Sequence, residues 1–235
     1  MIRRSFLLAT GTTFATAGSA WANASPYGAS LVFAAHRNGQ RIGTHTLSFQ
    51  EEAGNQIVST SIDFAVRMIG IAVYRYQHRS REVWTGDRFT SVVTETNDNG
   101  EKYAVQAQHD GASLVVRRRE PQSFVKTSAG DEALDHQHWI REVHPGSTLP
   151  STHWNIAQTR QQALLNTQTG KITRVSVREV GRETVTTANQ SPPATHFAYS
   201  GDIEMSQWFD DRSRWVKSTF KATTDGSTIE YILQG

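Results

Sequence analysis

The chain has 235 residues, of which 24 are basic and 22 are acidic, and it contains no cysteine. The lack of cysteine excludes disulfides, thiol nucleophiles, thiolate metal sites and lipid attachment through a cysteine. The balance of charges gives the protein no general basic character, so its composition does not indicate nucleic-acid binding.

The first residues, "MIRRSFLLATGTTFATAGSAWANA", have the three parts of an export signal: a basic start, a moderately apolar middle and small residues before a cleavage point. Arg3 and Arg4 resemble a twin-arginine signal, which predicts the twin-arginine export machinery as a partner. We expect cleavage after Ala22, with residues 1–22 as the signal and residues 23–235 as a single all-β domain in the periplasm. The apolar run is shorter than the roughly 20 residues that a span needs, so no stable membrane span is expected after cleavage.

Removal of this signal takes two arginines and no acidic residue, which leaves 22 basic against 22 acidic residues in the mature chain. Nucleic acid is therefore not an expected partner, and the run Arg117–Arg119 is interpreted as a solvated strand end. Without a cysteine to carry a lipid, the mature protein is expected to be soluble.

Alternating apolar and polar residues dominate the chain from Ser30 onward, with turn residues at the spacing of an antiparallel meander. The predicted strands lie within residues 31–49 (two strands around Asn38-Gly39), 56–66, 73–84, 89–119 (three strands), 171–187, 195–209, 214–224 and 227–235. Residues 121–170 are less regular, and a helix is predicted there at about Asn155 to Leu164. An antiparallel sheet of roughly ten strands curls because strands twist. We therefore expect an all-β fold, a strongly curved antiparallel sheet (barrel or half-barrel) with one short helix.

The predicted strand "VYRYQHRSREVW", residues 73–84, has one face that mixes aromatic and ionisable side chains. Alternation places on that face Tyr74, Tyr76, His78, Ser80, Glu82 and Trp84. The opposite face carries four long polar side chains, so the mixed face is expected to point into the curved sheet. A buried glutamate or histidine there needs hydrogen-bond partners. His78 and Glu82 are about 13 Å apart along the strand, too far to bond to each other.

Three interpretations of His78 and Glu82 stay open. In the first, both anchor the core, Glu82 through an arginine or a tyrosine hydroxyl and His78 through a backbone carbonyl. In the second, they line a cavity that holds water or a ligand. In the third, they act as general acid and base, although the sequence shows no third group in register.

A second candidate site is "THWN", residues 152–155, directly before the predicted helix. Trp154 is expected to close one end of the barrel, and Asn155 is a good N-cap because its side chain accepts from free backbone N–H groups. His136 and His138 would share a face of an extended segment, but zinc needs three or four ligands and Asp135 points the other way. We expect no metal and no cofactor, since no phosphate-binding glycine loop, nucleophile elbow or H-E-x-x-H helix occurs in the sequence.

Several blocks of the sequence, among them "TNDNGEKYAVQA", "LPSTHWN", "LLNTQTG" and "YSGDIEMSQWFDDRSRW", occur together and in order. From about residue 30 to 234 the chain resembles a family of exported bacterial proteins that share a domain of unknown function. The resemblance implies a small all-β periplasmic protein and no particular activity. Such proteins are loosely similar in shape to curved-sheet domains that hold lipids or other apolar molecules.

These features favour an exported protein that binds, non-covalently, an apolar or lipid-like ligand with a polar head. The predicted ligand-binding residues are Tyr74, Tyr76, His78, Glu82, Trp84 and Trp154. Two alternatives remain: a structural or partner-binding envelope protein with a packed core, and an enzyme that uses His78 and Glu82 for acid–base chemistry. An open interior would favour the binder or the enzyme, and a filled interior would favour the envelope protein.

Overall fold

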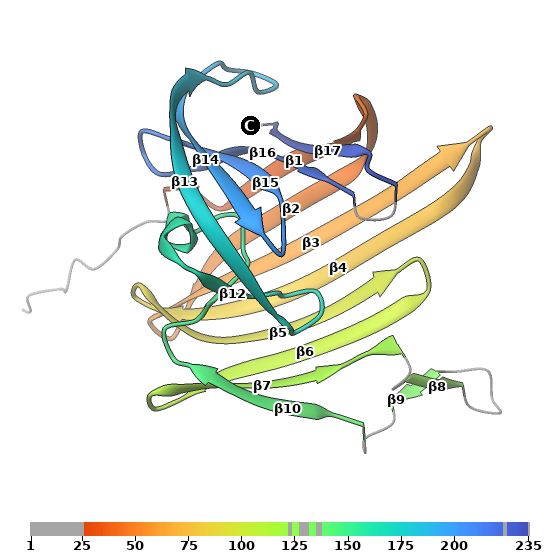
Figure 1. Cartoon of the computed structure of the whole chain (residues 1–235), viewed down its shortest axis with the longest axis vertical. Coiled ribbons are helices and arrows are strands. Elements are labelled where there is room, and N and C mark those ends of the chain that lie inside the picture. The colour runs from red at the N-terminus through yellow and green to blue at the C-terminus, as the bar shows by residue number, and fades with distance from the viewer. Residues whose placement is uncertain (1–25, 122–123, 127–131, 135–137, 223–224, 235) are drawn as a thin grey trace, which may run out of the picture.

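Long antiparallel strands build most of the molecule, as the computed structural model of the chain shows (Figure 1). The structure describes residues 26–121, 124–126, 132–134, 138–222 and 225–234. The predicted export signal, residues 1–22, and His136 therefore lie outside the described residues.

The strands follow the alternating runs of the sequence, and most are joined by short turns. The first half of the chain forms β1 (Ser30–Arg37), β2 (Gln40–Glu52), β3 (Asn55–Met68), β4 (Ile71–Thr85), β5 (Arg88–Asp98), β6 (Glu101–Asp110) and β7 (Ser113–Arg119). The middle forms β8 (Phe124–Lys126), β9 (Glu132–Leu134), β10 (Ile140–Pro145), β11 (Leu149–Pro150), the 3₁₀ helix η2 (Ile156–Arg160) and β12 (Ala163–Leu165). The last part forms β13 (Ile172–Thr184), β14 (Pro193–Gly201), β15 (Met205–Asp210), β16 (Trp215–Lys221) and β17 (Thr228–Leu233).

Fifteen of these strands form one sheet, in the order β10-β7-β6-β5-β4-β3-β2-β1-β17-β16-β15-β14-β13-β12-β11. The first and last strands pair near its middle, with Phe33 opposite Leu233. All neighbours are antiparallel except β11 and β12, which run in parallel. Because β10 and β11 are edge strands, the curved sheet is a half-barrel that does not close through hydrogen bonds. The predicted all-β, strongly curved antiparallel fold is confirmed.

The tight turn predicted at Asn38-Gly39 is present between β1 and β2. Asn38 has φ 48° and Gly39 has φ 81°, and the β5–β6 turn repeats this pattern with Asn99 at 52° and Gly100 at 102°. Asparagine and glycine tolerate these left-handed angles, and turns of this kind match the twist of the strands that they join.

The predicted helix at Asn155 to Leu164 is shorter than expected. Asn155 caps η2 as predicted, its side-chain oxygen accepting from the Ala157 backbone N–H at 2.9 Å. The helix ends at Arg160, because Leu164 and Leu165 pair with β13 and are buried there, a packing gain that outweighs helix propensity. In the described part of the chain, no helix is long and apolar enough to cross a membrane.

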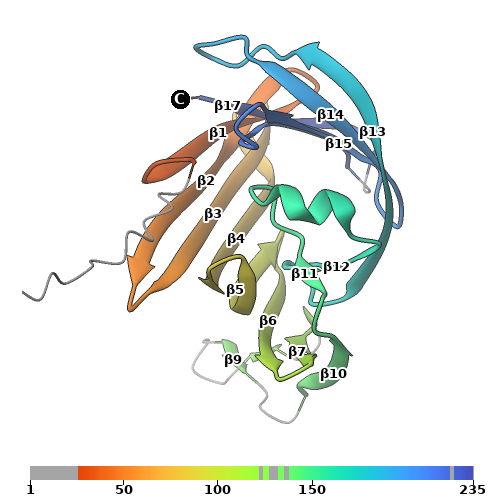
Figure 2. The ribbon, with the colours of Figure 1, turned by 90° about the vertical axis from the view of Figure 1, so that its left-hand side faces the viewer.

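Residues 148–171, which we call the inner segment, lie inside the half-barrel. Figure 2 shows η2 between the two halves of the sheet. The hydroxyl of Thr94 on β5 donates to the Thr167 carbonyl at 2.6 Å. At Gly170, which has φ 74°, an added Cβ would meet the Cβ of Arg118 at 2.7 Å, so only glycine allows this approach. The chain thus fills part of its own interior.

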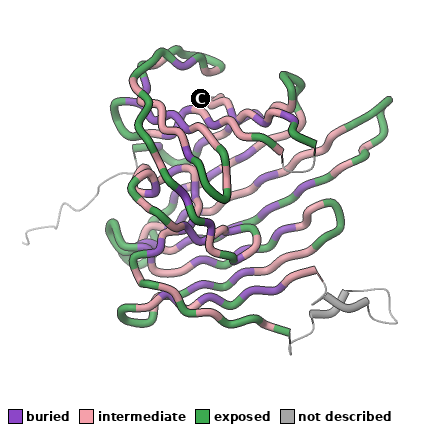
Figure 3. The backbone as a smooth tube through the Cα atoms, in the orientation of Figure 1, coloured by how far each residue is buried: buried purple, intermediate pink, exposed green. Residues whose placement is uncertain are grey.

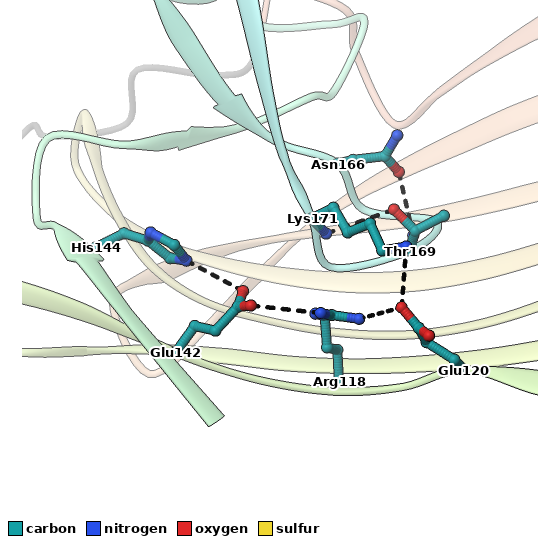
Figure 4. A network of polar contacts seen from close by, with 7 residues as sticks. All are labelled: Arg118, Glu120, Glu142, His144, Asn166, Thr169 and Lys171. Carbon is teal, nitrogen blue, oxygen red and sulfur yellow. Dashed lines mark hydrogen bonds and ion pairs between the residues drawn. The ribbon is translucent and has the colours of Figure 1, made fainter. Parts of the chain in front are cut away.

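Charged side chains fasten the inner segment to the sheet near β7 and β10 (Figure 4). Arg118 is 9% exposed and Arg119 is fully buried, so the prediction of a solvated strand end is wrong for these two residues. Arg118 forms ion pairs with Glu120 and, at 3.3 Å, with Glu142. Lys171 at the end of the inner segment reaches Glu120 at 2.9 Å. His144 lies 3.5 Å from Glu142. These contacts hold the inner segment close to the sheet beside the edge strand β10.

Candidate functional site

The mixed face of β4 points inward, as predicted. Each side chain from Tyr76 to Trp84 on that face is at most 7% exposed: Tyr76, His78, Ser80, Glu82 and Trp84. The alternate polar side chains from Arg75 to Arg81 are exposed, and this alternation is visible along the long strands in Figure 3. Tyr74, nearer the end of the strand, is partly buried and donates to Asp98 at 2.5 Å. The inner face of β4 therefore lies over the core and can be analysed one residue at a time.

Glu82 is held by two tryptophans. Its Oε2 accepts from the Trp84 indole N–H at 2.9 Å and from the Trp154 indole N–H at 3.3 Å. Burial raises the pKa of Glu82 to about 8, although both indole bonds oppose that shift. The prediction of an arginine or tyrosine partner is wrong, because both neighbours are indole N–H donors. Burial without a neighbouring cation keeps the carboxyl mostly protonated at neutral pH.

The tryptophans around Glu82 belong to a packed core. The Trp84 ring lies 5.2 Å from Trp154 and 5.3 Å from Phe89, and Trp154 lies 5.7 Å from Phe49, all between ring centroids. We call Glu82, Trp84 and Trp154 the Trp–Glu cluster. Every polar side-chain atom of this cluster that is named above has a partner, so the cluster works as a closed structural unit.

His78 is anchored through a side chain rather than through the backbone carbonyl that was expected. Its Nδ1 lies 2.8 Å from the Thr96 hydroxyl on β5, which donates in turn to the Gln168 carbonyl at 3.2 Å. Burial lowers the pKa of His78 to about 4, so the ring is neutral at physiological pH. His78 thereby connects β4 and β5 to the inner segment.

Two further histidines, the buried His45 on β2 and the partly buried His153 on the inner segment, lie close to each other. Their ring centroids are 5.7 Å apart. The His153 Nδ1 lies 2.7 Å from the Gln207 amide nitrogen, and the Gln207 oxygen accepts from Gln158 at 3.1 Å. Burial lowers the pKa of His153 to about 4. The pKa of His45 is also lowered, first by burial and then by the nearby His153 and His78. The interior therefore holds three neutral histidines.

Aromatic rings gather where β3 and β4 leave the sheet. Tyr76 stacks on Phe64 with 5.5 Å between the ring centroids. The Tyr231 centroid lies 5.9 Å from that of Phe64 and 5.5 Å from that of Phe220. We call Phe64, Tyr76, Phe220 and Tyr231 the aromatic cluster. Phe64 and Phe220 are only partly buried. Solvent therefore reaches part of the aromatic cluster.

Polar atoms beside the aromatic cluster are buried without a protein partner. In the described part of the chain, the Tyr76 hydroxyl and the His45 Nδ1 form no hydrogen bond, and neither does the Ser80 hydroxyl, which lies two residues from Glu82 on the same face of β4. The His45 ring lies 5.0 Å from the Tyr231 ring, which places it next to the cluster. An unpaired buried polar group typically costs about 1–3 kcal/mol, so these atoms are suited to a further hydrogen-bonding group.

The structure separates the six predicted ligand-binding residues into two groups. Glu82, Trp84 and Trp154 contact one another in the Trp–Glu cluster. Tyr76 lies in the aromatic cluster, with Tyr74 two residues closer to the hairpin end and His78 two residues deeper on the same face. Binding of a ligand by these residues stays a prediction.

Sequence reasoning missed His45, His153 and Gln207. His45 shares its strand face with Leu47 and Phe49, an alternation that could have flagged it as buried. The neighbours of His153 and Gln207 come from segments about fifty residues apart, and no local pattern indicates that pairing. Among the described residues, no group of three histidine or acidic side chains is placed to hold a metal ion, and His138 is exposed.

A family model described as "Domain of unknown function (DUF6134)" matches residues 33–234. The chain belongs to this family. The match covers the sheet from β1 to β17, which includes both clusters described above. No curated protein matches the chain.

The solved structures that are similar to the chain include two bacterial proteins. One is a beta-barrel-like protein of the domain of unknown function DUF1849 from Brucella abortus, with 10% sequence identity, a TM-score of 0.56, and coverage of 87% of this chain and 94% of that chain. The other is a Bacteroides fragilis protein with a YmcC-like fold, also 10% identical, with a TM-score of 0.34 and coverage of 87% and 93%. The first similarity supports the barrel-like fold and carries no information about activity.

Proposed function

We propose that this DUF6134 protein is exported to the periplasm and binds, non-covalently, an apolar molecule with a polar group at the aromatic cluster. The observation that carries this proposal is the unpaired Tyr76 hydroxyl and His45 Nδ1 beside partly buried aromatic rings. Apolar ligand sites combine such a surface with a few polar groups that fix the orientation of the ligand. Glu82 Oε2, by contrast, already accepts from two indole N–H groups.

The polar group of the ligand is expected to be uncharged. Burial lowers the pKa of His45 and raises the pKa of Tyr76, so both side chains are neutral at physiological pH. A neutral imidazole nitrogen and a phenol can each donate or accept, but neither compensates a buried full charge. An ester, amide or hydroxyl group on an apolar chain fits these partners better than a carboxylate or an amine.

A structural or partner-binding envelope protein remains the second candidate, because much of the interior is filled. Trp84, Trp215 and Phe33 are each at most 1% exposed. A groove of about 570 Å³ lies instead against the outer side of the sheet. Its lining is rich in small hydroxyl side chains on β2 and β3: Thr46, Ser48, Ser59, Thr60 and Ser61. An acid–base enzyme finds less support, since His78 and Glu82 bond to different protein groups.

The ligand proposal is tested with the purified exported protein. Native mass spectrometry should find a co-purifying apolar molecule, and the uncharged probe N-phenyl-1-naphthylamine should bind and raise the melting temperature by mass action. Phe64→Ser should weaken probe binding, while Val143→Ser, an exposed residue on the edge strand β10, serves as the control. A protein that carries no small molecule and ignores the probe would favour the packed envelope protein instead.

Export by the twin-arginine route is tested separately in cells. Changing Arg3 and Arg4 together to lysine keeps the positive charge but should leave the precursor in the cytoplasm, as cell fractionation would show. Normal processing of this double variant would overturn the proposed route and leave the ligand proposal untouched.

A further inference from the structure

The β3–β4 hairpin extends beyond the strands on either side of it (Figure 1). The pairing of β3 with β2 stops at Phe64 opposite Gly43, and the pairing of β4 with β5 stops at Tyr76 opposite Asp98. Beyond these points, in the described registers, the two strands pair with each other, and Arg75 alone still accepts from the Asn99 backbone N–H at 2.7 Å. At 3.3 Å per residue, the four steps along β3 from Phe64 to Met68 project about 13 Å.

Apolar side chains are exposed at the end of this hairpin. Met68 is 64% exposed, Ile69 101%, Ile71 70% and Val73 48%. Single exposed apolar residues are common on protein surfaces, but here four lie together on a narrow projection. We call residues 67–75 the hairpin tip.

The turn of the hairpin tip also has an unfavourable backbone conformation. Ile69 has φ 51° and Gly70 has φ 80°, the left-handed pair of a two-residue turn. The turns at Asn38 and Asn99 use a residue that tolerates this region, whereas a β-branched side chain disfavours it. An isoleucine at position 69 is therefore unfavourable for both the backbone conformation and the solvation of its side chain. The stability of the folded monomer does not explain why isoleucine occurs there.

The charged side chains within the hairpin tip, Arg67 and Arg75, are both basic, and Asp98 on β5 lies at its base, where it accepts from Tyr74 at 2.5 Å. The sequence has no acidic residue between Asp63 and Glu82. Arg67 and Arg75 are exposed and, among the described residues, form no ion pair. Arg67 instead donates to the Gly70 carbonyl at 3.2 Å, which keeps its guanidinium beside the apolar end.

We propose that the hairpin tip inserts into the interface of an anionic lipid bilayer. Met68, Ile69 and Ile71 would enter the boundary between headgroups and acyl chains, a depth of roughly 5–10 Å that the projection can reach. The two arginines would then lie at the level of the lipid phosphates, and Tyr74 at the headgroups. A two-stranded ribbon offers little of the about 800 Å² per partner of a stable protein interface, whereas a bilayer needs no complementary surface. This inference goes beyond the proposed function and does not depend on it.

Vesicle co-sedimentation of the purified exported protein tests the inference. Vesicles of phosphatidylethanolamine with phosphatidylglycerol should bind the protein at least tenfold more strongly than phosphatidylcholine vesicles, and added salt should weaken the binding. The triple variant Met68→Thr, Ile69→Asn, Ile71→Thr should lose at least tenfold in binding to the anionic vesicles. The double variant Arg67→Gln, Arg75→Gln should lose its preference for anionic lipid.

The variants keep the experiment independent of folding. Ile69→Asn places a residue that suits the turn, so its melting temperature should equal or exceed that of the wild type while its vesicle binding falls. Val143→Thr, another exposed apolar residue, should bind vesicles like the wild type. Equal binding of the wild type and the triple variant, or equal binding to both vesicle types, would overturn the inference. The inference would also be overturned if the protein did not bind vesicles but formed a dimer that Ile69→Asn dissociates. The hairpin tip would then bind a second copy of the chain.

Discussion

The two ends of the half-barrel interior differ in how their buried polar atoms are satisfied. In the Trp–Glu cluster, both indole N–H groups and the Glu82 oxygen that they reach are paired. Near the aromatic cluster, the Tyr76 hydroxyl and the His45 Nδ1 have no partner among the described residues. The same strand, β4, supplies both ends. Similar side-chain chemistry can therefore serve the core at one position and remain available for a ligand about 20 Å away along the strand.

Trp84→Ala is the strongest way to break the paired end. The side chain is 1% exposed, packs against two aromatic rings and donates to Glu82, so its loss leaves a cavity and removes the shorter of the two hydrogen bonds to Glu82. We expect a loss of about 3–5 kcal/mol in the free energy of unfolding, measured by chemical denaturation. A loss below about 1 kcal/mol would contradict the view of this end as a closed structural unit.

The pH dependence of stability tests the charge state of Glu82. The pKa of Glu82 in the folded protein is about 8, above its ordinary value of 4.5, so its contribution to stability is complete at low pH and is lost as pH rises toward 8. The pKa values of His78 and His153 are lowered to about 4, so their contribution is complete above about pH 6.5 and is lost as pH falls. Between about pH 6.5 and 8, stability should therefore fall by about 2 kcal/mol through Glu82.

Glu82→Gln separates this effect from the histidines. The amide cannot ionise but can still accept from both indoles, so the fall in stability between about pH 6.5 and 8 should disappear while the loss at acidic pH remains. Denaturation midpoints at several pH values measure both. An unchanged fall above pH 6.5 in the variant would show that another group titrates.

A matched pair of tyrosine substitutions compares the two ends most directly, with the smallest effects. The Tyr27 hydroxyl donates to the Trp154 carbonyl and accepts from the Trp215 N–H at 3.0 Å, so Tyr27→Phe should cost about 1–3 kcal/mol. The Tyr76 hydroxyl has no partner, so Tyr76→Phe should change stability by less than about 1 kcal/mol but reduce probe binding by up to about tenfold. Equal destabilisation by both would remove the distinction between the ends.

Local patterns in the sequence predicted the parts of this structure that depend on neighbouring residues. Alternation oriented β4 correctly, because successive side chains of a strand point to opposite faces. The cap at Asn155 and the turn at Asn38-Gly39 were also predicted, since each depends on a few adjacent residues. The sheet order beyond neighbouring strands was not predicted, because it depends on pairing between distant segments.

The partners of the buried polar residues could not be predicted for the same reason. Glu82 bonds to Trp154, which is 72 residues away in the sequence, and Thr96, the partner of His78, contacts Gln168 at the same separation. The predicted helix failed beyond Arg160, because Leu164 and Leu165 have their best packing against β13. A strand face can be predicted from alternation, but the groups that it faces come from the tertiary fold.

The pairing of the first and last strands has a consequence for how the protein is made. β1 leaves the ribosome early, yet its neighbour β17 spans Thr228–Leu233, so the two halves of the sheet cannot join until β17 has been synthesised. Until then, β1 and β16 each present an open edge on which another chain can add a strand. Contacts so distant in sequence also slow folding. A nascent or truncated chain that lacks the final strand is thus the form most exposed to aggregation and to chaperone binding.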